Sequence, residues 1–138
     1  MFLFSADKNN FALELNKVSE VAELREIVSV PGGIDYLTGA MSYKGELYLI
    51  VDLASFFSSG KTNTHDINVI IVDDDDYKIG FLTEKIVGAV DAQEECPSDD
   101  EFIKRQCKYN DSSVKLIDCE EIFLAIEKDI DSKNLRQV

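Results

Sequence analysis

The feature that most constrains this chain is an internal similarity between two segments that lie 66 residues apart. Residues 43–57 read YKGELYLIVDLASFF and residues 109–123 read YNDSSVKLIDCEEIF, and they align without a gap. Each segment runs from a tyrosine through a turn and an apolar strand pattern to an aspartate, and then to a phenylalanine. The similarity predicts two β lobes that each end in strand, aspartate and helix, with chance resemblance between strand-turn-strand units as the alternative.

The rest of the chain also favours strands. Turn-forming residues at 7–10 separate two apolar segments and predict a hairpin at the start of the chain. A second hairpin is predicted around Lys44-Gly45, and β-branched or alternating runs at 67–72, 77–82, 86–90 and 114–117 predict further strands. The acidic segment 91–101 is interpreted as a connecting loop. Apolar residues at helical spacing predict a C-terminal helix over about residues 119–130.

Charge and hydropathy limit the classes of partner. Lysine and arginine total 14 against 27 aspartates and glutamates, a formal charge of −13, so neither nucleic acid nor an anionic membrane is expected as a partner. The longest clean apolar run, residues 47–51, is far shorter than the roughly 20 residues that span a bilayer. The first residues also lack the basic segment of a signal peptide. We therefore expect a cytoplasmic protein with no membrane insertion, whose three cysteines are reduced and packed.

Two carboxylates are the best candidates for catalysis. Asp52 and Asp118 hold equivalent positions in the two similar segments and could serve as the acid pair of a small acidic hydrolase. The simpler interpretation, which we prefer, is that each caps the helix that follows it. The aspartates at 73–76 read as a turn, because Lys78 stands where a calcium loop needs glycine. Without zinc spacing, a phosphate loop or a dinucleotide motif, we predict no catalytic residue, metal or cofactor.

Four segments, taken in order, resemble the CheW-like family, the coupling proteins of bacterial chemosensory arrays. FALELNKVSEV at 11–21 is similar to the family's strand followed by a V-x-x-V-x-E segment. VPGGIDYLTGAMSYKGELYLIVDLASFF at 30–57 is similar to its Pro-Gly, glycine, N-x-R-G turn, strand and Asp-Leu series. KIGFLTEKIVGAV at 78–90 and VKLIDCEEIF at 114–123 resemble its last two segments.

The resemblance implies a mainly β fold in which residues 1–138 form a single CheW-like domain. Two small five-stranded β-barrel subdomains would share a hydrophobic core, with short helices and the C-terminal helix. The implied function is that of a non-catalytic adaptor that needs no cofactor and couples the cytoplasmic helical tip of a chemoreceptor to the regulatory domain of a chemotaxis histidine kinase. The receptor helix would lie in a groove between the lobes. The implied partner-binding positions are Val18, Glu20, Gly39, Lys44 and Gly45, with Glu20 and Lys44 as a charge pair.

The chain departs from the family pattern at this predicted contact. Residues 42–45 read S-Y-K-G where the family usually shows N-x-R-G, Leu49 stands where proline is common, and Glu84 stands where aspartate is usual. Lysine cannot reproduce the planar two-pronged contact of arginine. These differences bear on affinity or partner choice. The alternative function is an adaptor of a non-chemotactic chemosensory pathway, such as pilus or surface motility or gene control.

Overall fold

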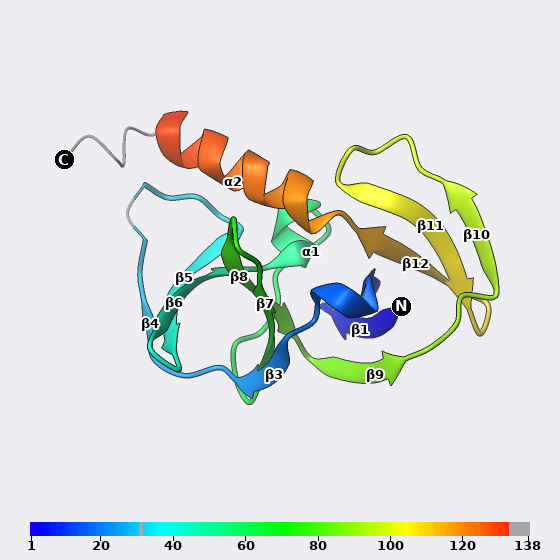
Figure 1. The fold of residues 1–138 in the computed structure, drawn as a ribbon, viewed down its shortest axis with the longest axis horizontal. Coiled ribbons are helices and arrows are strands. Elements are labelled where there is room, and N and C mark those ends of the chain that lie inside the picture. The colour runs from blue at the N-terminus through cyan, green and yellow to red at the C-terminus, as the bar shows by residue number, and fades with distance from the viewer. Residues whose placement is uncertain (31, 133–138) are drawn as a thin grey trace.

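The structure is a computed structural model that describes residues 1–30 and 32–132, so residue 31 and residues 133–138 of the predicted domain lie outside the described part. The described residues form strands, two α-helices and one 3-10 helix (Figure 1). In chain order they are β1 (Phe2–Ala6), β2 (Asn9–Leu13), η1 (Leu15–Lys17), β3 (Glu20–Glu23), β4 (Ile27–Val28), β5 (Leu37–Tyr43), β6 (Glu46–Val51), α1 (Leu53–Phe56), β7 (Asn68–Asp73), β8 (Lys78–Thr83), β9 (Lys85–Ala89), β10 (Glu94–Pro97), β11 (Ile103–Tyr109), β12 (Ser112–Ile117) and α2 (Cys119–Ser132).

The strands pair into two strongly curved sheets that stand side by side, with α2 lying across one end of both (Figure 1). The first sheet has the order β10-β11-β12-β2-β1-β9, and the second has the order β4-β5-β6-β8-β7-β3. The prediction of a mainly β fold with two β subdomains and a C-terminal helix is confirmed. Each sheet has six strands where five were expected, because the short strands β4 and β10 extend its edge.

The internal similarity of the sequence corresponds to equivalent pairing in the structure. β5 and β11 have seven residues each and begin 66 residues apart, and β6 and β12 have six residues each at the same offset. Both hairpins also shift register at the same place, after Leu37 in one and after Ile103 in the other. Shared lengths, pairing and irregularity favour a true internal repeat over chance resemblance.

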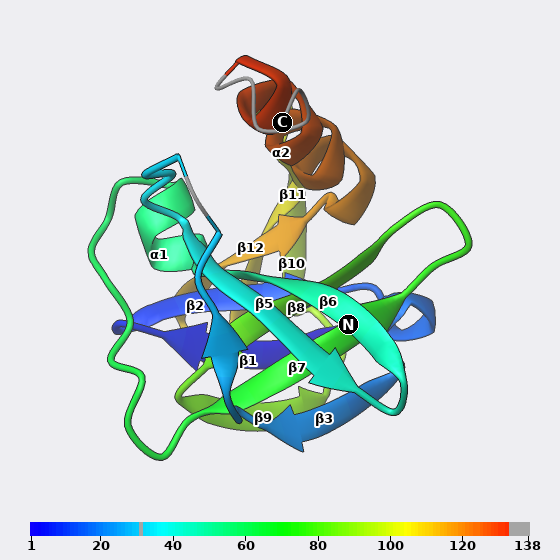
Figure 2. The same cartoon turned by 90° about the vertical axis from the view of Figure 1, so that its left-hand side faces the viewer.

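The two halves of the chain exchange strands. Strands β1 and β2 belong to the first sheet, whereas the four strands that follow belong to the second. The second half does the reverse, since β7 and β8 join the second sheet and β9 to β12 join the first. As a result β3 pairs with β7 and β1 pairs with β9, so each sheet contains strands from both halves (Figure 2).

A single buried cluster connects both sheets with α2. It includes Phe4 and Phe11 from the first sheet, Phe81 from the second, and Ile122 and Ile126 from the helix. The helix begins where it was predicted, because two acidic residues occupy its first turn and its apolar residues fall on one face. The lobes therefore share a hydrophobic core, as the family resemblance implies.

The acidic segment 91–101 was misinterpreted as a loop throughout. Residues Glu94–Pro97 form β10, which pairs antiparallel with β11. All four residues of β10 are exposed, so the strand has no apolar alternation by which a sequence could reveal it. Its Cys96 is exposed as well, so the prediction that all the cysteines are packed is wrong for this one, while Cys107 and Cys119 are buried.

Candidate partner-binding site

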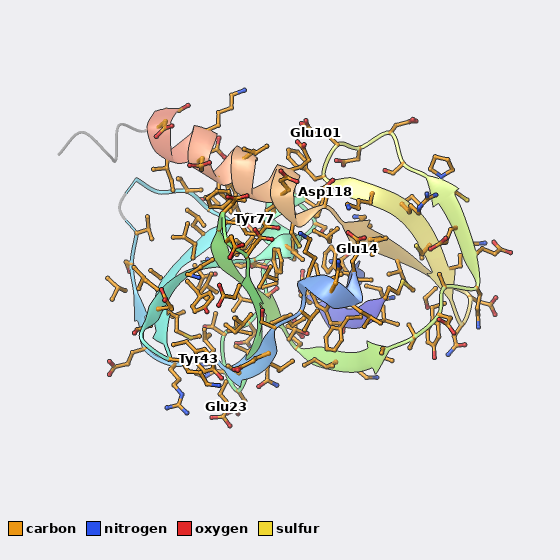
Figure 3. The ribbon with its side chains drawn as sticks, in the orientation of Figure 1. Glu14, Glu23, Tyr43, Tyr77, Glu101 and Asp118 are labelled. Atoms are coloured by element: carbon orange, nitrogen blue, oxygen red, sulfur yellow. The ribbon has the colours of Figure 1, made fainter. Side chains whose placement is uncertain are left out.

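A charged cluster links the two edge regions of the second sheet. Glu20 lies on β3 at one edge of this sheet, whereas Tyr43 and Lys44 lie where β5 turns into β6 near the other edge. The curvature of the sheet brings these edges together, and the side chains meet. Tyr43 lies at the end of the sheet away from α2 (Figure 3).

The carboxylate of Glu20 accepts a hydrogen bond on each oxygen. The Lys44 Nζ lies 2.6 Å from Oε1, and the Tyr43 hydroxyl donates to Oε2. The Lys44 Nζ also lies 5.5 Å from the centroid of the Tyr43 ring, within the range of a cation–π contact. The hydrogen bonds from Lys44 and then Tyr43 lower the pKa of Glu20, and the hydrogen bond to Glu20 raises the pKa of both Lys44 and Tyr43. The charge pair predicted between Glu20 and Lys44 is therefore present in the structure.

The turn that presents Lys44 depends on left-handed backbone. Lys44 has φ +50° and Gly45 has φ +81°, which is the geometry of a two-residue hairpin turn between antiparallel strands. A side chain at Gly45 would meet nothing within 4 Å, so glycine is favoured there by its backbone angle alone. Gly45 thus sets the direction of the turn and leaves Lys44 exposed.

The other two predicted residues lie outside this cluster. Gly39 is buried on β5 with φ +152°, and a Cβ there would lie 2.1 Å from Ile27 Cγ2 and 2.6 Å from the Val28 carbonyl oxygen. Its local role is therefore to let β4 approach β5. Val18 follows η1 and packs, half-buried, against the shared core two residues before Glu20.

Tyr43 is a member of the cluster that sequence reasoning missed. It occupies the variable position of the N-x-R-G pattern, so the pattern assigns it no role. The only signal in the sequence is an aromatic hydroxyl directly before the predicted turn. Its significance depends on the curvature of the sheet, which brings β3 beside it.

The surface has one hollow beside the charged cluster and a larger one away from it. A small one of about 180 Å³ borders the cluster and is lined by Ser19, Glu20, Tyr43, Lys44, Glu46, Tyr48, Ile71 and Asp73. A larger one of about 660 Å³ lies between α1 and α2, where the Tyr36 hydroxyl donates a 2.5 Å hydrogen bond to Asp129. The five predicted partner-binding residues contribute nothing to the lining of the larger hollow.

The two candidate catalytic aspartates have separate structural partners. Asp118 accepts a 3.2 Å hydrogen bond from the backbone N–H of Glu121, so the prediction that it caps α2 is correct. For Asp52 the same prediction is wrong, because its buried carboxylate makes no cap bond to α1 and instead accepts from the Thr62 N–H at 2.9 Å and the Thr62 hydroxyl at 2.6 Å. Neither carboxylate is hydrogen-bonded to the other among the described residues.

The described part of the chain offers neither a cluster of metal-binding side chains nor a helix that could span a membrane. Residues 1–30 and 32–132 contain no group of three or more histidine, cysteine, aspartate or glutamate side chains that could hold a metal ion. Across the same residues, no helix is both long enough and apolar enough to cross a lipid bilayer.

Two curved sheets that exchange strands, with a charge cluster at one end and a helix across the other, define a class of small β scaffold domain. The sequence profile of the CheW-like domain matches residues 1–127, and the chain belongs to that family. The family comprises non-catalytic scaffold proteins, in agreement with the prediction that this chain is not an enzyme.

Individual relatives are distant in sequence. The chain is similar to "Chemotaxis protein CheW" of Thermotoga maritima, with 22% identity over 87 residues that cover 63% of this chain. The match spans only 58% of the length of that relative. Among solved structures, the scaffolding protein TtCheW from Thermoanaerobacter tengcongensis superposes with a TM-score of 0.72 at 22% identity, over 86% of this chain and 82% of the other. This likeness shows a shared fold.

Proposed function

We propose that this chain is a cytoplasmic adaptor that couples the helical tip of a chemoreceptor to the regulatory domain of a chemotaxis histidine kinase. The observation that carries the proposal is the Glu20–Lys44 pair, which the family resemblance implies and which forms in the folded chain. The exchange of strands between halves supports the view that residues 1–138 act as one adaptor domain, since each sheet depends on both halves.

The surface around the pair suits a helical partner. A helix that docks on a protein is recognised by apolar anchors, while charges fix its register. Val21, the residue after Glu20 on β3, and Leu47 on β6 are large apolar side chains that remain 42% and 60% exposed. The ammonium of Lys44 offers donors to acidic groups on the partner, because the side chain of Lys44 is 67% exposed.

Exchanging the charge at residue 44 tests the proposal. Lys44→Glu places two carboxylates beside each other and removes the ammonium, so we expect affinity for a receptor cytoplasmic fragment to fall about tenfold or more. Affinity for the kinase regulatory domain should change less than about twofold, because rim charges act locally. Isothermal titration calorimetry with the two purified partner fragments measures both constants.

Lys108→Glu is the matched control. Lys108 is an exposed lysine near the equivalent turn of the other sheet, and its exchange should leave receptor affinity unchanged. Equal losses for both partners with Lys44→Glu would refute the assignment of this turn to the receptor. A wild-type chain that binds neither fragment would refute the adaptor function, and a chain that binds only the kinase of a pilus or gene-control system would assign it to the non-chemotactic alternative.

A further inference from the structure

We propose that Tyr43 and Lys44 together replace a single arginine, and that Tyr43 is therefore a specificity-determining residue of the receptor surface. The proposal rests on the proposed function and extends it to a residue to which the family pattern assigns no role. Arginine binds a carboxylate through two parallel N–H donors that reach both oxygens, whereas a lysine ammonium acts as a point charge. A lysine at this position alone would bind one oxygen of Glu20 and leave the other to solvent, because the side chain of Glu20 is 38% exposed.

The observed contacts supply the second donor from the neighbouring residue. Lys44 binds Oε1 of Glu20 and the Tyr43 hydroxyl binds Oε2, so the carboxylate is held at both oxygens. The ring of Tyr43 also lies beneath the ammonium. The planar, two-pronged function of one arginine is therefore divided between a hydroxyl and an ammonium.

The hairpin turn explains why adjacent residues can reach the same carboxylate. Successive side chains of a regular strand point to opposite faces, so Tyr43 and Lys44 would normally diverge. Tyr43 is the last residue of β5, and the left-handed backbone of Lys44 turns the chain back at that point. Both side chains then reach Glu20 on β3.

This arrangement leaves Lys44 available to a partner. An ammonium has three N–H donors, and one of them is directed to Glu20. Because the Tyr43 hydroxyl binds the other carboxylate oxygen, Lys44 does not have to bridge both oxygens of Glu20. The remaining donors can bind a carboxylate on the receptor helix, so the partner group that we assign to this point is an aspartate or glutamate side chain.

Three variants at residues 43 and 44 should differ in their affinity for the receptor fragment. In Tyr43→Phe, Oε2 loses its donor and Glu20 competes with the receptor for Lys44, so affinity for the receptor fragment should fall about three- to tenfold. Lys44→Arg alone should give little gain, because Tyr43 already occupies the oxygen that the second prong would bind. In the double variant Tyr43→Phe/Lys44→Arg, the guanidinium reaches both oxygens, and affinity should return to within about twofold of the wild type.

The experiment compares the wild type, both single variants and the double variant by two measurements. The first is the pKa of the Glu20 carboxylate, followed by carbon-detected NMR during an acid titration without any partner. It should rise in Tyr43→Phe and fall again in the double variant. The second is the dissociation constant for the receptor fragment. Tyr109→Phe, which changes the equivalent tyrosine of the other sheet, should leave both measurements as in the wild type.

Each outcome decides one of the two proposals. The pKa of Glu20 could be the same in Tyr43→Phe and the wild type, or the double variant could fail to lower it again. Either result would refute the proposal that Tyr43 and Lys44 together replace one arginine. If the pKa responds as expected while receptor affinity does not follow it, the specificity role of Tyr43 is refuted. If the pKa of Glu20 responds but the wild type binds no receptor fragment, the proposed function is refuted. The role of Tyr43 toward the receptor is then refuted as well, while the contact of Tyr43 and Lys44 with Glu20 remains established.

Discussion

Asp52 shows how one buried side chain can fix a loop. Its position after β6 is typical of a helix cap, yet its carboxylate reaches ten residues along the chain to Thr62. Both groups are nearly inaccessible, at 3% exposure each. A buried carboxylate is costly unless its oxygens are hydrogen-bonded. The pair therefore holds the polar segment 58–66 against the body of the protein.

Removal of the Thr62 hydroxyl should expose this dependence. Thr62→Val keeps the shape of the side chain and leaves one carboxylate oxygen of Asp52 without its donor, so we expect the free energy of unfolding to fall by about 2 kcal/mol. Denaturation by urea, followed by circular dichroism, measures the change. Thr64→Val alters an exposed threonine of the same loop and should cost under about 0.5 kcal/mol. Equal stability of the two variants would contradict the structural role of the Asp52–Thr62 contact.

The three cysteines should react at very different rates. Burial raises the pKa of Cys119 to about 12 and also raises the pKa of Cys107, whereas Cys96 is exposed on β10. Since the thiolate is the reactive form, a disulfide reagent at neutral to mildly alkaline pH should modify Cys96 first and the other two only after unfolding. Absorbance of the released thiol in native and denatured protein measures this. Rapid modification of all three in the native state would contradict the buried positions.

At the level of elements, the two glycines of the β5–β6 hairpin have different roles. A Cβ at Gly39 would overlap the Val28 carbonyl oxygen, which belongs to the backbone of β4 and cannot rotate away. At Gly45 the space is open and only the positive φ opposes a side chain. One glycine is therefore required for strand packing and the other for turn geometry.

Alanine at each position should separate these roles. Gly39→Ala should lower the free energy of unfolding by about 2–3 kcal/mol through steric overlap, and Gly45→Ala by about 1 kcal/mol through backbone strain. Thermal unfolding of both variants gives the order. Gly39→Ala should bind the receptor fragment like the wild type when binding is measured well below the melting temperature of the variant, because Gly39 acts through its packing against β4. A loss that persists in the fully folded variant would instead support direct contact at Gly39.

Elements with a local signal could be predicted from the sequence, and those without one could not. The hairpin at Lys44-Gly45 was predictable because its turn residues stand between two apolar runs. The helix α2 was predictable from its cap and its apolar spacing. In β10 every residue is exposed, and β4 has only two residues, so both exist through pairing with a neighbour rather than through their own composition.

Some residues of the candidate site could likewise be located before the structure was known, and others could not. The resemblance to a family located Glu20 and Lys44, and their contact was found in the structure. It could not locate Tyr43, whose contact with Glu20 joins residues 23 positions apart across the curved sheet. Nor could it show that Gly39 packs under β4, because that depends on an edge strand without a pattern of its own.

At the scale of the whole molecule, strand exchange makes each sheet depend on both halves of the chain. Four pairings cross between the halves, namely β3 with β7, β6 with β8, β12 with β2 and β1 with β9. The shared core also takes side chains from both sheets and α2. Stability should therefore be a property of the complete chain.

Division of the chain in its polar loop tests this. Fragments 1–65 and 66–138 should each lack cooperative thermal unfolding, because each contains only part of either sheet. Mixed in equal amounts, they should regain the circular dichroism spectrum of the intact protein and show a cooperative transition. A control cut near the end of α2, after residue 129, should leave an intact fold. Independent folding of either half would contradict the dependence between the sheets.

The exchange of strands also defines what each half of the chain lacks on its own. One repeat alone, with two strands for one sheet and four for the other, has no way to complete either sheet. Two identical copies laid against each other would complete both. The pairings are those that two half-length chains would make with each other, so the covalent link between the halves places what would be an interface between two chains in the interior of one.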